Sequence, residues 1–169
     1  MNAAHGAVSY DQSWTTNGMT HEVAAAYDIR SASSSIDSDL DYTRHEITAS
    51  YRYRQGRQAV SAEWMGGQAH GEVPLFERFS LGDTRTLRGW NKFDLAPAGG
   101  TRAFYQSLEY SYRGFALFLD AGSVWDAPGS ASTKFSTGFG YHAKNVFLTL
   151  GIPLASDEGN VSFMMGVRF

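Results

Sequence analysis

The stretch TRHEITASYRYR, residues 43–54, places apolar and polar side chains on opposite faces of an extended chain. Its apolar side chains recur at every second position, at Ile47, Ala49, Tyr51 and Tyr53. The positions between them are polar, and they are Glu46, Thr48, Ser50, Arg52 and Arg54. A period of two residues is that of a β-strand, in which successive side chains point to opposite faces of the sheet. The stretch therefore predicts a strand with one apolar and one polar face.

The same alternation recurs along most of the chain and predicts nine strands. Eight main strands are expected between residues 20 and 169. The stretch AHGAVSYDQSW, residues 4–14, predicts an additional one, which a turn containing Asn17-Gly18 joins to the next strand. The eight main ranges are 20–32, 42–54, 57–69, 101–112, 114–125, 133–142, 145–152 and 160–169.

The connections between the predicted strands alternate in length. Short ones follow residues 54, 112 and 142, whereas long polar ones follow residues 32, 69, 125 and 152. Soluble sandwiches also alternate apolar and polar side chains, but they have no reason to sort their loops in this way. Short periplasmic turns and long outer loops are typical of outer-membrane barrels. We therefore expect an all-β protein, an antiparallel transmembrane β-barrel that forms a single domain over residues 1–169.

The composition excludes several classes of protein. The longest apolar runs, residues 23–27 and 115–119, are far shorter than a membrane-spanning helix. The formal net charge of -3 provides no basic surface for nucleic acid. The chain has no cysteine, and its five histidines lack the spacing of a metal site. We therefore expect no nucleic-acid partner and no metal site.

Aromatic side chains gather near the ends of the predicted strands, as they do in the interfacial girdles of membrane barrels. These side chains are Trp14, Tyr42, Tyr110, Tyr112, Trp125 and Tyr141. Single-chain bacterial barrels have an even number of strands. The odd count of nine therefore indicates a piece of something larger.

The longest connection, residues 70–100, contains the sequence LRGW at residues 87–90. Arg88 beside Gly89 indicates a tight turn, and Trp90 is suited to anchoring that turn against a wall. Loops of this length without secondary structure of their own are usually functional or disordered. This one is too rich in aromatic residues for disorder, so we expect a functional extracellular loop.

Several of these motifs together resemble one family. ERFSLGDTRTLRGW, residues 77–90, is similar to the loop of the BamA/TamA outer-membrane assembly and two-partner secretion superfamily, also called the bacterial surface antigen type, whose core is an Arg-Gly-aromatic tripeptide. FYQSLEYSYR and ALFLDAGSVW resemble the strands that follow this loop in the family, and GFGYHAKNVFLTLGIPL and NVSFMMGVRF resemble its last strands. The resemblance is specific over about residues 57–169 and extends over residues 4–56 by pattern alone.

The resemblance implies a site for the loop arginine. In the family this arginine folds into the lumen and pairs with acidic residues of the next two strands, which here implies Arg88 with Glu109 and Asp120. The alternation supports the same orientation independently. If Leu108 and Leu119 face lipid, then Glu109 and Asp120 face inward.

The last strand resembles the signal that the barrel assembly machinery reads in bacterial outer-membrane proteins. Its alternating apolar residues are Val161, Phe163, Met165, Val167 and Phe169. The family resemblance implies insertion or translocation of outer-membrane proteins in the bacterial outer membrane. The lipid bilayer and the assembly machinery are the implied partners. The resemblance implies no enzyme activity and no cofactor.

The chain also departs from the family pattern. Family members have about sixteen strands and usually periplasmic POTRA modules, whereas this chain has half of such a barrel and no POTRA-like pattern. An eight-stranded barrel is filled by its own side chains and has little room for a long loop. The loop then stays at the mouth, or a second copy of the chain completes a larger barrel, or the chain is a fragment.

Other candidate sites carry weaker signals. Asp37, Asp39 and Asp41 alternate in one loop, but the remaining ligands of a calcium loop are missing, so a solvated acidic loop is expected. Glu63 and Glu109 both point inward, as a catalytic carboxylate pair of a barrel hydrolase would. Ion pairs explain the two glutamates better, because inward charges need partners. The candidate partners are Arg52, Arg54, Arg113 and Arg168.

The alternative functional class is a small autonomous barrel with a structural role. A related alternative is a membrane anchor for a larger protein, for example a patatin-like lipase. An enzymatic domain on the same polypeptide would favour the anchor.

Overall fold

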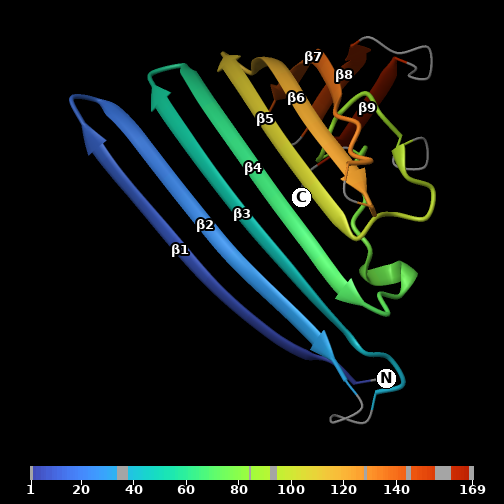
Figure 1. The fold of residues 1–169 in the computed structure, drawn as a ribbon. Helices are drawn as coiled ribbons and strands as arrows, with labels where there is room; N and C mark the ends of the chain where they lie inside the picture. Colours follow the sequence, from blue (N-terminus) through green and yellow to red (C-terminus); the bar gives the residue numbers. More distant parts are fainter. Residues whose placement is uncertain are drawn as a thin grey trace.

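Over the residues that it describes, a computed structural model shows one antiparallel sheet of nine strands in sequence order (Figure 1). The structure describes residues 2–33, 38–83, 85–91, 95–127, 129–143, 146–154 and 161–167. A short 3-10 helix, η2 (Leu75–Glu77), follows β4. The strands are β1 (Ala4–Thr16), β2 (Met19–Ala32), β3 (Tyr42–Gln55), β4 (Gln58–Gly71), β5 (Arg102–Tyr112), β6 (Phe115–Trp125), β7 (Lys134–Ala143), β8 (Val146–Leu154) and β9 (Ser162–Val167).

The strands agree with the period-two pattern, and the additional N-terminal strand is present as β1. Tight turns join β1 to β2 and β5 to β6. Both central residues of these turns have positive φ, 52° and 74° at Asn17 and Gly18, and 52° and 91° at Arg113 and Gly114. This is the type I′ conformation, whose twist matches that of the flanking strands. No helix in the described part of the chain is long and apolar enough to cross a membrane.

The sheet is curved but open. Within the described residues, β1 pairs only with β2, and β9 pairs only with β8. Figure 1 shows β1 to β4 fanning out, with β7 to β9 lying behind β5 and β6. The all-β antiparallel class is therefore confirmed, and the barrel wall that the structure shows has two free edges.

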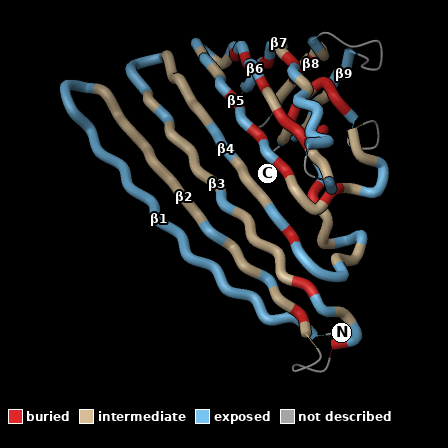
Figure 2. Tube along the Cα trace, viewed as in Figure 1, coloured by how far each residue is buried: buried red, intermediate tan, exposed pale blue. Residues whose placement is uncertain are grey.

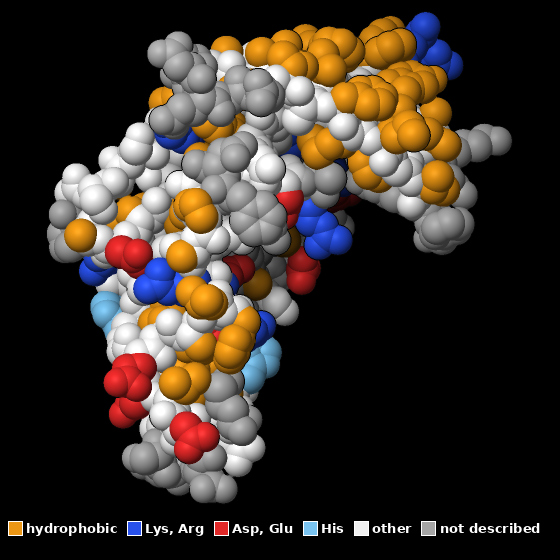
Figure 3. All heavy atoms as spheres, turned by 90° about the vertical axis from the view of Figure 1, so that its right-hand side faces the viewer, with side chains coloured by type: hydrophobic (Ala, Val, Ile, Leu, Met, Phe, Trp, Pro, Cys, Tyr) orange, Lys and Arg blue, Asp and Glu red, His pale blue; other side chains and the backbone are white. Residues whose placement is uncertain are grey.

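The two faces of the sheet differ sharply from β5 to β9. On β6, Leu117 is 63% exposed, whereas its neighbours Ala116 and Phe118 are each 3% exposed on the opposite face. Hydrophobic side chains gather at the top of the molecule in Figure 3. The exposed large apolar residues of β5 to β9 are Phe104, Leu108, Tyr110, Tyr112, Phe115, Leu117, Leu119, Phe135, Phe139, Tyr141, Val146, Leu154, Phe163, Met165 and Val167.

One expected girdle residue belongs to the other face. Tyr42 is only 1% exposed, because it shares its parity with Arg44 and Glu46 on the inner face of β3. Its position at a strand end therefore reflects packing inside the sheet rather than contact with lipid.

The long connection between β4 and β5, residues 72–101, folds back over the inner face of the sheet, and we call it the covering loop. Two clusters of buried side chains lie between the covering loop and the sheet. One cluster contains Leu81, Leu87, Trp90 and Tyr105, and the other contains Ala69, Phe79 and Ala103. In Figure 2 the buried residues concentrate in this region, whereas β1 is exposed throughout.

The covering loop is therefore a lining of the inner face rather than a loop confined to the mouth. The physical reason is room: a closed eight-stranded barrel is filled by its own side chains, whereas this open sheet leaves its inner face free. Glycines of the sheet add to that room, because they have no side chain. A Cβ on Gly67 would lie 2.3 Å from Cε1 of Phe79, and a Cβ on Gly151 would lie 2.5 Å from the backbone nitrogen of Gly89.

We expect Gly67→Ala to destabilise the folded protein by about 1–3 kcal/mol, because the added methyl group displaces the packed ring of Phe79. Gly66→Ala is the matched control on the other face, where the nearest atom, Cγ2 of Ile47, lies at an ordinary 3.5 Å. Urea unfolding midpoints of both variants in detergent measure the difference. Equal midpoints would contradict the close packing of the covering loop.

Candidate functional site

The side chain of Arg88 is bonded to two strands of the inner face. Its Nε donates to Oδ2 of Asp120 at 3.0 Å, and its Nη2 donates to Oδ1 at 2.9 Å, which forms a two-pronged fork. Nη1 donates to Oε2 of Glu109 at 2.6 Å. The guanidinium carbon lies 3.6 Å from the ring centroid of Phe118. One arginine is thus held by two carboxylates and an aromatic ring.

The strand register explains why these acceptors meet. Ser107 of β5 lies opposite Asp120 of β6, and Glu109 lies opposite Phe118. All four residues have the parity of the inner face. The hydroxyl of Ser107 accepts from Nη2 of Arg88 at 3.0 Å and donates to Oδ1 of Asp120 at 2.7 Å. Asp120 is completely buried, so its charge is compensated by these donors rather than by water.

The backbone of the LRGW sequence turns Arg88 toward the sheet. Leu87 has φ of 48°, a left-handed conformation that costs free energy in a residue with a branched side chain, and Gly89 has φ of 102°. Leu87 is fully buried in the cluster with Leu81 and Tyr105. The backbone N–H of Arg88 also donates to Asp120 Oδ2 at 2.9 Å. Buried packing and a backbone hydrogen bond thus hold the strained turn.

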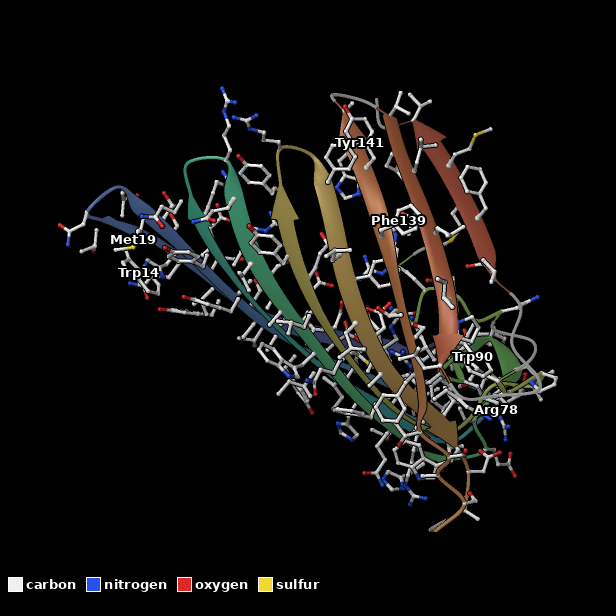
Figure 4. All side chains as sticks on the ribbon, turned by 90° about the horizontal axis from the view of Figure 1, so that it is seen from above. Trp14, Met19, Arg78, Trp90, Phe139 and Tyr141 are labelled. Atoms are coloured by element: carbon white, nitrogen blue, oxygen red, sulfur yellow. The ribbon has the colours of Figure 1, made fainter. Side chains whose placement is uncertain are left out.

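Trp90 fixes the end of this turn on β7. Its Nε1 donates to the carbonyl oxygen of Phe135 at 3.0 Å, and its ring lies 5.3 Å from Nζ of Lys134. The residue is only 4% exposed. Figure 4 shows Trp90 in the covering loop, away from Phe139 and Tyr141, which lie farther along β7 toward its turn end.

The electrostatics favour a charged arginine. Burial disfavours the charge on Arg88, but the hydrogen bonds and charges of Asp120 and Glu109 more than offset this, so its pKa is raised above its ordinary value. Arg88 therefore stays protonated and serves as a fixed ionic contact. It does not release a proton in this site.

Substitution of Arg88 by lysine is expected to lower the thermal unfolding temperature almost as much as substitution by alanine. A single ammonium cannot reproduce the fork to Asp120 and the third bond to Glu109. The measurement compares Arg88→Lys and Arg88→Ala in detergent. A lysine variant that unfolds at the wild-type temperature would show that the fork geometry is unimportant.

The residues of the predicted C-terminal assembly signal lie far from the arginine site in the sequence. The apolar side chains of Val161, Phe163, Met165 and Val167 are exposed at and beside β9, and Phe169 lies outside the described residues. These four side chains are therefore placed where a membrane or a partner can reach them. Whether they act as an assembly signal stays a prediction.

The expected ion pairs of the inner glutamates differ from those observed. Arg52 and Arg54 lie 3.8 Å and 3.6 Å from Glu22 of β2, because the β2–β3 register places Glu22 opposite Arg52. Arg113 lies over the ring of Tyr112 in a turn, and Arg168 lies outside the described residues. The cation beside Glu109 is instead Arg88.

The weaker candidates gain no support as a catalytic or metal site. Glu63 and Glu109 line one open cavity of about 810 Å³, with Glu109 bonded to Arg88. Asp37 lies outside the described residues, and the residues that are described contain no group of three or more side chains that could hold a metal ion.

Sequence reasoning missed two residues of the arginine site, Ser107 and Phe118. The signal that was available is parity, since Ser107 lies two residues before Glu109, and Phe118 two residues before Asp120. Each pair therefore shares the inner face.

The fold and the site together define a class: a barrel wall with an apolar outer face and an arginine loop folded against its inner face. The family model of the Omp85 superfamily domain matches residues 9–164. The chain therefore belongs to the Omp85 superfamily, and it is a protein of the bacterial outer membrane. The resemblance of the motifs to this superfamily is confirmed.

A curated relative supports this assignment. The chain is 31% identical over 103 residues to the outer membrane protein assembly factor BamA of Nitratidesulfovibrio vulgaris (strain Hildenborough). The match covers 52% of this chain and 13% of that protein. The chain thus corresponds to a small part of the length of this relative.

Proposed function

We propose that the chain forms one wall of a barrel that inserts proteins into the outer membrane or moves them across it. The observation that carries the proposal is the contact of Arg88 with Asp120 and Glu109, in a chain of the Omp85 superfamily. The name of the related assembly factor supports the same role. In this proposal the arginine contact keeps the covering loop at a fixed place in the lumen.

The proposal involves no catalysis and no cofactor. The work is the exchange of hydrogen bonds and apolar contacts, and the partners are the lipid bilayer around the outer face and the barrel assembly machinery during the protein's own insertion. A second copy of the chain is an additional candidate partner at the free edges. The exposed apolar side chains of β5 to β9 support the contact with lipid.

The test is an insertion assay with the full-length protein that carries this chain. Wild-type protein and Arg88→Ala are reconstituted in phospholipid vesicles, and an unfolded outer-membrane barrel protein is added. We expect Arg88→Ala to lose most of the insertion activity, measured as the fraction of client that resists unfolding by SDS without heating. Arg85→Ala is the matched control, because Arg85 lies in the same loop with its side chain exposed.

Reconstituted variants are first checked for their own heat-dependent mobility, so that only folded protein is compared. Insertion at the wild-type rate by folded Arg88→Ala would contradict the proposal. That result would favour a structural barrel or a membrane anchor instead.

A further inference from the structure

A second arginine, Arg44 of β3, contacts the covering loop from the sheet. Its Nε donates to the backbone carbonyl oxygen of Glu77 at 3.0 Å, and its guanidinium carbon lies 4.1 Å from the ring centroid of Phe79. Its Nη2 donates to Oε2 of Glu46 at 2.5 Å. The side chain of Arg44 is 13% exposed, close to the 14% of Arg88. Both arginines are therefore shielded cations stacked on a phenylalanine.

Phe79 lies at the root of the covering loop, where its two limbs meet. The backbone N–H and C=O of Phe79 each bond with Gly100 at 2.9 Å. The ring is 3% exposed, packs on Ala69 and Ala103, and lies over Gly67. Arg44 thus covers a ring that packs on β4 and β5 at the point where the two limbs of the loop are hydrogen-bonded.

Glu77 extends these contacts to the edge of the sheet. Its carboxylate lies 3.5 Å from Nη1 of Arg30 on β2 and 3.9 Å from Nε of Arg44. Arg30 in turn lies 3.5 Å from Asp28, which bonds with His5 of the edge strand β1. Alternating charges of Glu77, Arg30 and Asp28 therefore run from the covering loop across β2 toward β1.

We propose that Arg44 is a positioning residue that forms a second anchor of the covering loop, separate from the Arg88 anchor. The second anchor consists of Arg44, Glu77 and Phe79 and holds the root of the loop against β2 to β4. The Arg88 anchor consists of Arg88, Glu109 and Asp120 and holds the tip against β5 and β6. The two arginines point in opposite senses, since Arg44 reaches from strand to loop and Arg88 from loop to strand.

The two anchors attach the covering loop to different strands of the inner face. Loss of one anchor therefore leaves the other in place. This inference concerns the position of the loop, and it holds whether or not the protein inserts clients. Trypsin provides separate readouts for the two parts, because it cleaves after Arg78 near the root and after Arg85 near the tip. Proteolysis of a locally opened segment follows the population of its open form.

The experiment compares cleavage rates at these two bonds in folded protein in detergent. Arg44→Ala is expected to raise the rate of cleavage after Arg78 by about tenfold and to leave the rate of cleavage after Arg85 unchanged. Asp120→Ala is expected to do the reverse, with faster cleavage after Arg85 only. Glu77→Gln keeps the backbone acceptor but removes the charge, and it is expected to give an intermediate increase after Arg78.

Arg52→Ala is the matched control, because Arg52 lies on the same face of β3 and pairs only loosely with Glu22 at 3.8 Å. It is expected to change neither rate. Equal acceleration at both bonds in Arg44→Ala would show that the loop opens as one unit and would overturn the proposal. An unchanged rate after Arg78 would overturn it as well. If Arg44→Ala does not fold, Arg44→Lys provides the same comparison, since it keeps the charge but loses the planar stacking on Phe79.

Discussion

Asp120→Ala is expected to destabilise the folded protein by about 3–5 kcal/mol, the cost of leaving a buried charge without its partner. Asp120 is fully buried and accepts four hydrogen bonds, three from Arg88 and one from Ser107. Its loss leaves the guanidinium of Arg88 with Glu109 as its single carboxylate. The cost exceeds that of an exposed pair because little water reaches the site.

Urea unfolding of Asp120→Ala in detergent measures this loss. Asp11→Ala is the control, because Asp11 is an exposed inward-facing carboxylate of β1, and a change within about 0.5 kcal/mol is expected there. A loss at Asp120 no larger than that at Asp11 would show that the covering loop does not bury Arg88 against β6.

Leu119→Arg is expected to destabilise the protein in lipid vesicles by about 2–4 kcal/mol, the cost of an arginine at the middle of the lipid-facing surface of a barrel. Leu119 lies in the middle of β6 on the outer face and is 48% exposed. Ser50→Arg is the matched control, because Ser50 lies on the inner face and lines a cavity beside Glu22 and Glu63.

The measurement is urea-induced unfolding of both variants in phospholipid vesicles. A large loss for Leu119→Arg with a small one for Ser50→Arg identifies the outer face as the surface in contact with lipid. Equal tolerance of both arginines would mean that water, not lipid, covers the face of Leu119.

Sequence patterns predicted the strands and their faces because both depend on local chemistry. In residues 43–54 the period of two residues is complete, and β3 covers that stretch with the expected faces. The Asn17-Gly18 turn was recognisable from its residue types, since both positions require positive φ. The pairing of Arg88 with Glu109 and Asp120 came from the family resemblance, with support from strand parity.

The course of the covering loop depends on long-range packing and could not be predicted in the same way. The alternation says which face a side chain occupies, but not how strongly the sheet curves or which strands the loop crosses. Gly67 reads as an ordinary strand glycine, and only the ring of Phe79 above it gives it a role. The contact of Arg44 with Glu77 joins residues 33 apart, and no local pattern of the sequence pairs the two.

The central claim is that Arg88 of the covering loop is bonded to Asp120 on the inner face of the sheet. A double-mutant cycle of Arg88→Ala and Asp120→Ala, scored by the free energy of unfolding in detergent, tests it most directly. The structure predicts that the double variant loses less stability than the sum of the single losses, by about 1–3 kcal/mol. Additivity within about 0.5 kcal/mol would contradict the account, because it would mean that the two side chains do not touch.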